Sequence, residues 1–556
     1  MTIRILILTL LLLFAQTAIG QNSVEVFAHT NKPLPDQIKH LRKEKSSINT
    51  YRINTRIEVF ISDLWNSGFL EVEIDSSWLE NDIRHYALVL GRQFHWLKIK
   101  RDKELSELLQ NYDIEIEDLS EEPLSVRSFQ IFHTRILAEL ADIGHPYASI
   151  RLDSIEIRDS LVNASLFVDP GSRVFIDSIV SRSADVVHEK VLWRLSGFSK
   201  GDWYSQKQII KAGKNLQFIG IVEENESLET GFFNDKAWLY LRPKKPRANR
   251  FDGIIGLAPA TTSGIPSLSG ELNLQLNNVL KQMESLMLTW RAPGNGSQKL
   301  TTRLSWPYFM GSSFGFSGEL EMYRKDTSYL NLGASGGVRY SFDPGIWIDL
   351  LFERRQSSHL NPVILSNISE FNLNMSKISW QIDKRNKKFN ASRGWIVRNQ
   401  LGYGIKEIQD NKSEMQTSDY YEIDLSSDVY LPIYKSWSGF IGLNGGYRSG
   451  ELAENESYRL GGANLLRGFS EENFNSSLFL LSSLELRYNF GGGSNFHFFL
   501  DGGFLDSSIF PYSPGIGLSL QTKAGLLKLD YALGQIVGEA FSLQSGLIHL
   551  GIQSNF

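Results

Sequence analysis

The alternation of apolar and polar residues along this chain changes its period near residue 245. Before that point, apolar residues recur at helical spacing between short strand-like runs. After it, the helical period is lost and apolar and polar residues alternate one by one, which is typical of strands with two different faces. The basic, proline-containing segment 242–247 lies at the change and indicates a linker. The pattern predicts an α+β N-terminal part and an all-β C-terminal part.

The N-terminal part repeats a short motif three times. A leucine, three further residues and a glycine close each apolar-periodic helix, and a strand-like run follows. The glycines are Gly68, Gly144 and Gly220, and consecutive ones lie 76 residues apart both times. Equal spacing at one structural position is typical of tandem modules. A glycine is favoured there because a helix that turns sharply into a strand needs a left-handed residue.

Each module is predicted to run strand, helix, helix, strand, strand. In the third copy we expect the first strand at 173–180, the helices at 186–195 and 204–218, and part of the closing strand at 237–241. The three modules are then assigned to residues 21–91, 92–171 and 172–245. Three unrelated α+β domains are the alternative, and the equal spacing of the glycines argues against them.

The C-terminal part reads as strands of about ten residues, each with one apolar and one polar face. Phe314, Phe316 and Leu320 share one face, whereas Glu319 and Glu321 share the other. Segments 346–353 and 483–490 alternate in the same way. We count roughly sixteen such strands in residues 250–556, an even number, as single-chain outer-membrane barrels have. This predicts an antiparallel transmembrane β-barrel.

Composition limits the protein class further. Residues 1–20 combine a positive charge, an apolar core and small residues before Gln21, which predicts a cleaved secretory signal peptide. An uncleaved membrane anchor is the alternative, but the apolar core is too short to span a bilayer. The chain has no cysteine, which excludes a disulfide framework, a thiol nucleophile and cysteine-ligated zinc. A net charge of -5 gives no reason to expect nucleic acid as a partner.

One loop of the C-terminal part carries an arginine among glycines and bulky apolar residues. It lies between strands predicted at 437–448 and 475–489, the eleventh and twelfth of the barrel. With both barrel ends in the periplasm, it is the sixth external loop. The glycine pair allows a sharp fold. A solvated arginine on an external loop is the alternative interpretation. The distinctive residues are Gly461, Gly462, Leu466, Arg467, Gly468 and Phe469.

Three features together resemble the BamA/TamA family of outer-membrane assembly factors. They are the arginine loop, a following strand that bears Phe499, Asp501 and Gly503, and a last strand with Gly551 that ends on the aromatic Phe556. The repeated modules are similar to POTRA domains, and three copies resemble the TamA layout more than the five-module BamA layout. Ser554 departs from the apolar residue usual on the lipid-facing side of the last strand.

The resemblance implies that the loop folds back into the barrel lumen with Arg467 docked on the inner wall. A buried charge needs a hydrogen-bonded counter-charge. Asp501 and Glu485 both project inward by alternation and are the expected partners of Arg467, on the strand face that also carries Phe499. Gly503 is expected to leave space for the loop backbone.

The same resemblance implies a function in protein assembly. The modules would lie in the periplasm and capture unfolded outer-membrane or secreted polypeptides at a sheet edge. The barrel would lie in the lipid of a bacterial outer membrane and insert or translocate these polypeptides at its seam, without ATP. A periplasmic or inner-membrane partner protein is compatible with this layout. A two-partner secretion transporter and a passive outer-membrane channel are the alternatives.

An enzyme is the least favoured class. A barrel hydrolase would need a histidine beside a serine or a carboxylate. The barrel part holds three histidines, His359, His497 and His549, and their spacing shows no such arrangement. We therefore expect no catalytic residue, no cofactor and no metal.

Overall fold

The structure is a computed structural model. It describes residues 25–32, 51–80, 83–101, 103–111, 122–182, 186–222, 226–243, 249–258, 267–292, 296–361, 368–387, 391–409, 415–450, 452–491, 493–506, 508–522, 525–540 and 546–553. The predicted signal peptide, most of the predicted linker, Ser554 and Phe556 lie outside these residues. The chain divides into two compact units. One holds the first two modules with small parts of the third, and the other holds the rest of the third module and the barrel.

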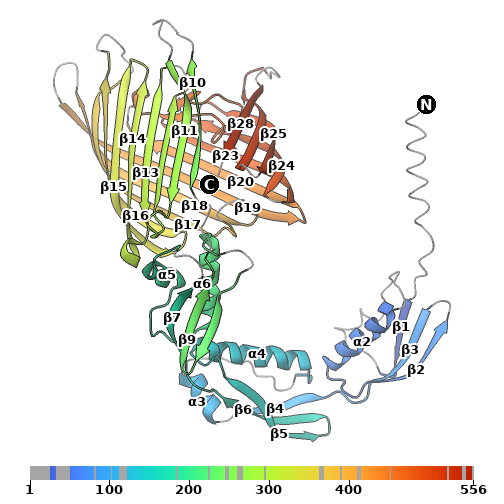
Figure 1. The fold of residues 1–556 in the computed structure, drawn as a ribbon. Helices are drawn as coiled ribbons and strands as arrows, with labels where there is room; N and C mark the ends of the chain where they lie inside the picture. Colours follow the sequence, from blue (N-terminus) through green and yellow to red (C-terminus); the bar gives the residue numbers. More distant parts are fainter. Residues whose placement is uncertain are drawn as a thin grey trace, which may run out of the picture. The chain divides into compact units, whose positions relative to one another are not determined.

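Each N-terminal module contains a three-stranded sheet whose last strand is central (Figure 1). In the first two modules the first strand pairs parallel to that central strand and the second pairs antiparallel. The second and third modules follow the predicted order of strand, helix, helix, strand, strand. The elements are β1 (Glu25–Thr30), α2 (Tyr51–Trp65), β2 (Glu73–Glu80) and β3 (Ile83–Val89); β4 (His95–Arg101), α3 (Lys103–Asn111), α4 (Val126–Asp142), β5 (Ser149–Arg158) and β6 (Leu161–Asp169); and β7 (Phe175–Ser181), α5 (Glu189–Ser196), α6 (Gln206–Phe218), β8 (Glu229–Phe233) and β9 (Lys236–Leu241).

The second module shows how the helical period produces a core. Helix α4 starts at the N-cap Ser125, whose hydroxyl accepts the Ser128 amide. Its buried residues Phe132, Ile136 and Leu140 recur every four positions and therefore share one face. They pack against the alternate residues of β6 that are buried, namely Val162, Ala164, Leu166 and Val168.

The three repeat glycines end their helices in left-handed geometry. Gly68, Gly144 and Gly220 have φ angles of 90°, 105° and 78°. The carbonyl of Gly68 accepts the Phe94 amide at 2.8 Å, and the carbonyl of Gly144 accepts the Val174 amide at 2.8 Å. Each of these two glycines therefore also ties its module to the next one. The strand-like run that follows Gly220, at 221–223, does not form a strand in its described residues 221–222, which are a buried bend, and β8 begins only at 229.

A second repeated contact joins the modules. The Asn66 side-chain oxygen accepts the Arg127 amide at 3.1 Å, and Asp142, 76 residues later, accepts the Lys207 amide at 2.7 Å. The Arg127 and Lys207 amides lie in the first turns of α4 and α6, which belong to the second and third modules. Backbone N–H groups in a first turn lack helical partners. A residue at the end of one module thus caps a helix of the next. The third equivalent position is Phe218, whose ring packs against Gly345 in a barrel turn.

Replacing Asp142 with alanine is expected to loosen the first turn of α6, because the Lys207 amide and the Ser205 hydroxyl lose their acceptor. Loss of such a cap costs about 0.5–2 kcal/mol. Hydrogen–deuterium exchange of the full-length protein should show faster exchange in the peptide that begins α6 and unchanged exchange at the start of α4. Asp142→Asn keeps the accepting oxygen and serves as the control. Equal exchange in the alanine and asparagine variants would contradict the capping role.

The C-terminal part is an antiparallel barrel of sixteen long strands, as predicted, with the two-residue β27 (Gln535–Ile536) added beside β25 (Figure 1). Among the described residues, no helix is long and apolar enough to cross a membrane. The long strands are β10 (Arg250–Ala258), β11 (Ser267–Asn277), β12 (Ser285–Ala292), β13 (Gln298–Trp306), β14 (Phe314–Lys325), β15 (Tyr329–Asp343), β16 (Ile346–His359), β17 (Phe371–Asp383), β18 (Gly394–Gln409), β19 (Met415–Tyr434), β20 (Trp437–Arg448), β23 (Leu478–Gly491), β24 (Ser494–Leu505), β25 (Pro511–Thr522), β26 (Gly525–Leu533) and β28 (Gly546–Gln553).

The two faces of the barrel strands follow the predicted alternation. On β16, Leu350 and Phe352 are 61% and 56% exposed on the outer face. Their neighbours Asp349 and Glu353 are buried toward the lumen. Strand β23 repeats the pattern, with Leu484 exposed and Glu485 directed inward. An apolar outer surface over a charged interior is the arrangement that a lipid bilayer requires of a barrel wall.

The third module packs on the barrel turns that follow β11, β13 and β15. Tyr308, in the turn between β13 and β14, is 6% exposed and belongs to the apolar core that also contains Val191 and Leu195 of α5. Met283, in the turn between β11 and β12, packs against the same core. Burial raises the pKa of the Tyr308 hydroxyl to about 12. Two side chains of the barrel therefore complete the core of this module.

Polar contacts fix the same joint. Arg194 of α5 donates to the carbonyl oxygens of Ser341 and Phe342 at 2.6 and 3.0 Å. Lys211 of α6 forms an ion pair with Asp343 at 3.1 Å. These acceptors lie where β15 turns into β16, so three successive turns on one rim of the barrel contact the module.

Candidate functional site

The arginine loop forms a hairpin of its own. It connects β20 and β23, the eleventh and twelfth barrel strands, and is therefore the sixth loop on the rim opposite the third module. Within it, β21 (Tyr458–Leu460) pairs antiparallel with β22 (Phe474–Ser476), after the short helix η3 (Glu454–Glu456). Apolar residues of the loop pack against inward-facing residues of β23 and β24; the core is Leu460, Leu466, Phe469, Phe479, Leu481 and Leu505.

Glycines allow the tip of the hairpin to turn tightly. Gly461, Gly462 and Gly468 have φ angles of 129°, 84° and 85°, which residues with a side chain rarely adopt. A Cβ on Gly468 would collide with Ser513 and with the backbone of Gly534. The loop backbone therefore approaches the barrel wall directly at Gly468, immediately after the arginine.

Arg467 lies against the inner wall with only 4% of its surface exposed. Its Nε and Nη2 atoms donate to the two carboxylate oxygens of Asp501, each at 2.7 Å. The Arg467 backbone amide donates to the same carboxylate at 3.2 Å. Nη2 also lies 2.8 Å from Glu485 and donates to the Ser483 hydroxyl at 2.9 Å. The two-pronged contact with Asp501 fixes the orientation of the guanidinium as well as its position.

Phe499 supplies the floor of the site. The guanidinium carbon of Arg467 lies 3.5 Å from the centroid of the Phe499 ring, in cation–π geometry. Burial acts to lower the pKa of Arg467, but the hydrogen bonds and charge of Asp501, with the charges of Glu485 and Asp530, outweigh it and leave the pKa above its usual value. Arg467 is therefore a permanent cation in this site.

Two more strands contribute residues that the sequence did not connect with the loop. Asp530 of β26 lies 3.7 Å from Arg467 Nη1 and 3.0 Å from His497 Nε2. His549 of β28 accepts the Gly468 amide at 3.1 Å. The convergence of these residues on one loop depends on the curvature of the barrel, which alternation along single strands does not show. His497 therefore lies beside a carboxylate, a pairing that the spacing of the histidines did not predict.

The structure places the remaining predicted residues differently. A Cβ on Gly503 would meet the carbonyl of Leu480 on β23, so this glycine permits close approach of two strands and does not make room for the loop. Gly551 lies in β28 opposite Lys528. Glu472, which follows the loop motif, accepts a hydrogen bond from the Tyr323 hydroxyl at 2.8 Å.

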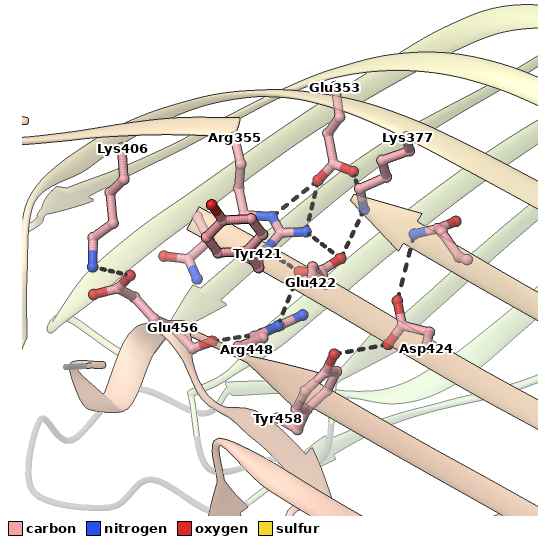
Figure 2. Close-up of polar contacts among 12 residues, drawn as sticks. Glu353, Arg355, Lys377, Lys406, Tyr421, Glu422, Asp424, Arg448, Glu456 and Tyr458 are labelled. Carbon is pink, nitrogen blue, oxygen red and sulfur yellow. Dashed lines mark hydrogen bonds and ion pairs between the residues drawn. The ribbon is translucent and has the colours of Figure 1, made fainter. Parts of the chain in front are cut away.

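A second group of charged residues lines the lumen wall further round the barrel (Figure 2). Glu422 of β19, 2% exposed, contacts Lys377 at 2.7 Å and both Arg355 and Arg448 at 3.1 Å. Glu353 also pairs with Arg355 at 2.7 Å. We call these five residues the wall network. Sequence alternation placed Glu353 toward the lumen but did not predict the network.

The loop leaves a cavity of 970 Å³ within the lumen. Its lining alternates acidic and basic side chains, for example Glu271, Arg291, Glu321 and Lys299, several of which pair with one another. Within the described residues, no group of three or more His, Asp or Glu side chains could hold a metal ion. The lumen is thus polar, balanced in charge and partly filled by the hairpin.

Comparisons with known proteins bear on this architecture. Residues 289–544 match the Omp85 superfamily domain. Among solved structures, the chain is similar to CdiB from Acinetobacter baumannii, with 13% identity, a TM-score of 0.52 and coverage of 92% of this chain and 100% of that one. For CdiB from Escherichia coli the identity is 14%, the TM-score 0.51 and the coverage 84% of this chain and 91% of that one.

A further similar structure is BamA from Haemophilus ducreyi lacking POTRA domains 1–3, with 17% identity and a TM-score of 0.47 over 84% of this chain and 100% of that one. At these identities the likenesses concern the fold alone. A comparison with curated proteins finds no match. The family match agrees with the resemblance inferred from the sequence over residues 289–544, and the CdiB structures agree with the predicted fold, whereas the TamA-like layout and the domain boundaries stay predictions.

Proposed function

Because residues 289–544 match the Omp85 superfamily domain, we propose that this protein inserts or translocates substrate polypeptides at a bacterial outer membrane without ATP. In this proposal the POTRA-type modules lie in the periplasm and capture unfolded polypeptides. The barrel lies in the outer membrane, and the seam between its first and last strands receives the incoming strand. No catalytic residue takes part, and the energy comes from folding and burial of the substrate.

The seam is the observation that carries this proposal. Among the described residues, hydrogen-bonded ladders join neighbouring long strands all the way from β10 to β28, but no ladder joins β28 back to β10. Strand β28 has eight residues, whereas β19 has twenty. A sheet edge in a membrane leaves backbone N–H and C=O groups without partners, which is costly in hydrocarbon. Such an edge favours pairing with an added strand.

The modules offer further edges at which a polypeptide could add. Strand β2 is an edge strand exposed along its whole length, with Ile74, Trp78 and Leu79 each at least 40% exposed. Strand β5 is also an edge and exposes Ile155 and Ile157. Main-chain hydrogen bonds to an edge give affinity with little sequence preference, which suits a protein that handles varied unfolded chains.

Site-specific photocrosslinking in cells tests the proposal. Probes at Ile254 of β10, Ile552 of β28 and Trp78 of β2 are expected to capture nascent outer-membrane proteins. A matched probe at Leu350, on the lipid-facing wall of β16, is expected to capture none. Crosslinks to one secreted polypeptide from positions inside the lumen would indicate a dedicated secretion transporter instead. Absence of polypeptide crosslinks at both seam and module would contradict polypeptide handling and leave a passive channel.

A further inference from the structure

The base of the arginine loop binds the lumen wall at a site of its own. The strands that form this site differ from those that bind Arg467. The residues are Asn455, Glu456 and Tyr458 of the loop with Lys406, Asp424 and Arg448 of strands β18, β19 and β20, and we call them the limb site. Figure 2 labels all of these residues except Asn455. We propose that the limb site is a second lock that retains the loop in the lumen in addition to the Arg467 site. The proposal concerns how the loop is held and stands whichever polypeptide the protein handles.

A buried ion pair forms the first part of this lock. Lys406 Nζ lies 2.6 Å from Glu456 Oε2, and the two side chains are only 4% and 3% exposed. Arg448 donates to the backbone carbonyl of Glu456, and the Ala453 amide donates to the second oxygen of its carboxylate. Removal of either charge would leave the other buried without its partner, which is strongly unfavourable. The pair is therefore made only when the loop occupies this position.

Tyr458 ties the loop to the wall network. Its hydroxyl donates to Asp424 at 2.8 Å, and the Arg448 guanidinium lies 3.9 Å from the centroid of its ring. Arg448 in turn donates to Glu422 at 3.1 Å. The loop thus rests on a group of charges that are already fixed by one another.

Asn455 provides specificity of position. Its side chain is 2% exposed and donates to the Ser357 hydroxyl and the Ser369 carbonyl, both at 2.7 Å. Its side-chain oxygen accepts the Ser369 amide, and its carbonyl oxygen accepts the Asn331 amide group at 2.7 Å. Few other side chains could both donate and accept at these places. This segment of the loop therefore fits the wall in one register.

The hairpin links the base of the loop to its tip, so the position of the base determines that of the tip. Tyr458 begins β21, whose ladder with β22 fixes the base of the hairpin, and Gly462 and Phe469 are hydrogen-bonded across it nearer the tip. Arg467 lies between those two residues. Glu456 and Tyr458 are thus positioning residues for Arg467, and withdrawal of the loop requires both the limb site and the Arg467 site to open.

The absence of cysteine in the chain allows a direct test on the full-length protein in lipid vesicles. A single cysteine replaces Leu465 at the hairpin tip, and its reaction with a membrane-impermeant maleimide reports loop exposure. The labelling rate of this single-cysteine protein is then compared with the rates after Glu456→Gln, after Arg467→Ala and after both changes together. We expect each single change to raise the labelling rate about tenfold and the combination to raise it about a hundredfold, because the free-energy effects of two separate sites add.

Two controls separate retention of the loop from general damage. Glu454→Gln alters an exposed acid in the same short helix and should leave labelling unchanged. Exchange of the charges, with Glu456→Lys and Lys406→Glu in one protein, should restore slow labelling. Tyr458→Phe removes only the hydroxyl and should raise labelling slightly without affecting barrel folding. Single-channel recording should show longer openings in the same variants that label faster.

Two results together would overturn the proposal. The Glu456→Gln and Tyr458→Phe variants would label at the same rate as Glu454→Gln, and the double variant would label no faster than Arg467→Ala. The loop would then be held by its tip alone. Since labelling is measured without any substrate, this outcome leaves the proposed function in polypeptide assembly untouched. Failure of substrate crosslinking at the seam would, in turn, leave the two-lock proposal intact.

Discussion

Arg467→Ala is expected to abolish assembly of substrate proteins and to lower barrel stability by about 3–5 kcal/mol, the usual result of breaking a buried, hydrogen-bonded ion pair from one side. The change leaves Asp501, Glu485 and Asp530 close together without the cation that compensates them. It also removes the group that covers the Phe499 ring. The shift of the unfolding midpoint in lipid, followed by heat-dependent gel mobility, measures the stability change.

The matched control for this prediction is Glu471→Ala, at an exposed position of the same loop, for which we expect a change within about 0.5 kcal/mol. Arg467→Asp combined with Asp501→Arg should recover part of the stability, because opposite charges again face each other. Full stability and full assembly activity in Arg467→Ala would refute the docking of the loop as a functional contact.

Glu422→Ala should be the most destabilising single change in the wall network. Arg355 and Lys377 would keep Glu353 as a shared partner, whereas Arg448 would lose its contact with Glu422, so we expect a loss of about 3–5 kcal/mol and increased exposure of the loop base. Chemical unfolding of the full-length protein in lipid, with loop labelling as a second readout, checks both effects.

Glu319 provides a control, because it is also a glutamate in an ion pair but is more exposed to solvent. It forms an ion pair with Arg303, and their side chains are 33% and 56% exposed. Solvent screens such a pair, so Glu319→Ala should cost no more than about 1 kcal/mol. If Glu422→Ala and Glu319→Ala prove equally mild, the wall network is not a structural element of the barrel.

The sequence predicted those features that depend on local period. Alternation identified the barrel and the inward direction of Asp501 and Glu485, and the glycine spacing identified the modules. Features that depend on how distant strands come together were not predictable. Asp530 and His549 reach the Arg467 site only because β26 and β28 curve round the lumen, and Glu456 meets Lys406 across fifty residues of chain.

The contacts between the modules were not predicted from the sequence for a different reason. Asn66 and Asp142 are 76 residues apart, so the signal was present, but a polar residue near a helix end is common and has many uses. Only the structure shows that both accept amides from the following module. The role assigned to Gly503 was wrong because a glycine in a strand marks close approach without saying which backbone approaches.

The insertion of Tyr308 and Met283 into the third module has a consequence for biogenesis. During synthesis this module precedes the barrel, yet its apolar core lacks two side chains until the first four barrel strands and their turns have formed. A newly made chain therefore carries an incompletely folded segment that matures together with the barrel. If the protein lies in the outer membrane as proposed, completion of the module marks the start of membrane integration, and a stalled precursor would expose this unfinished core to periplasmic chaperones and proteases.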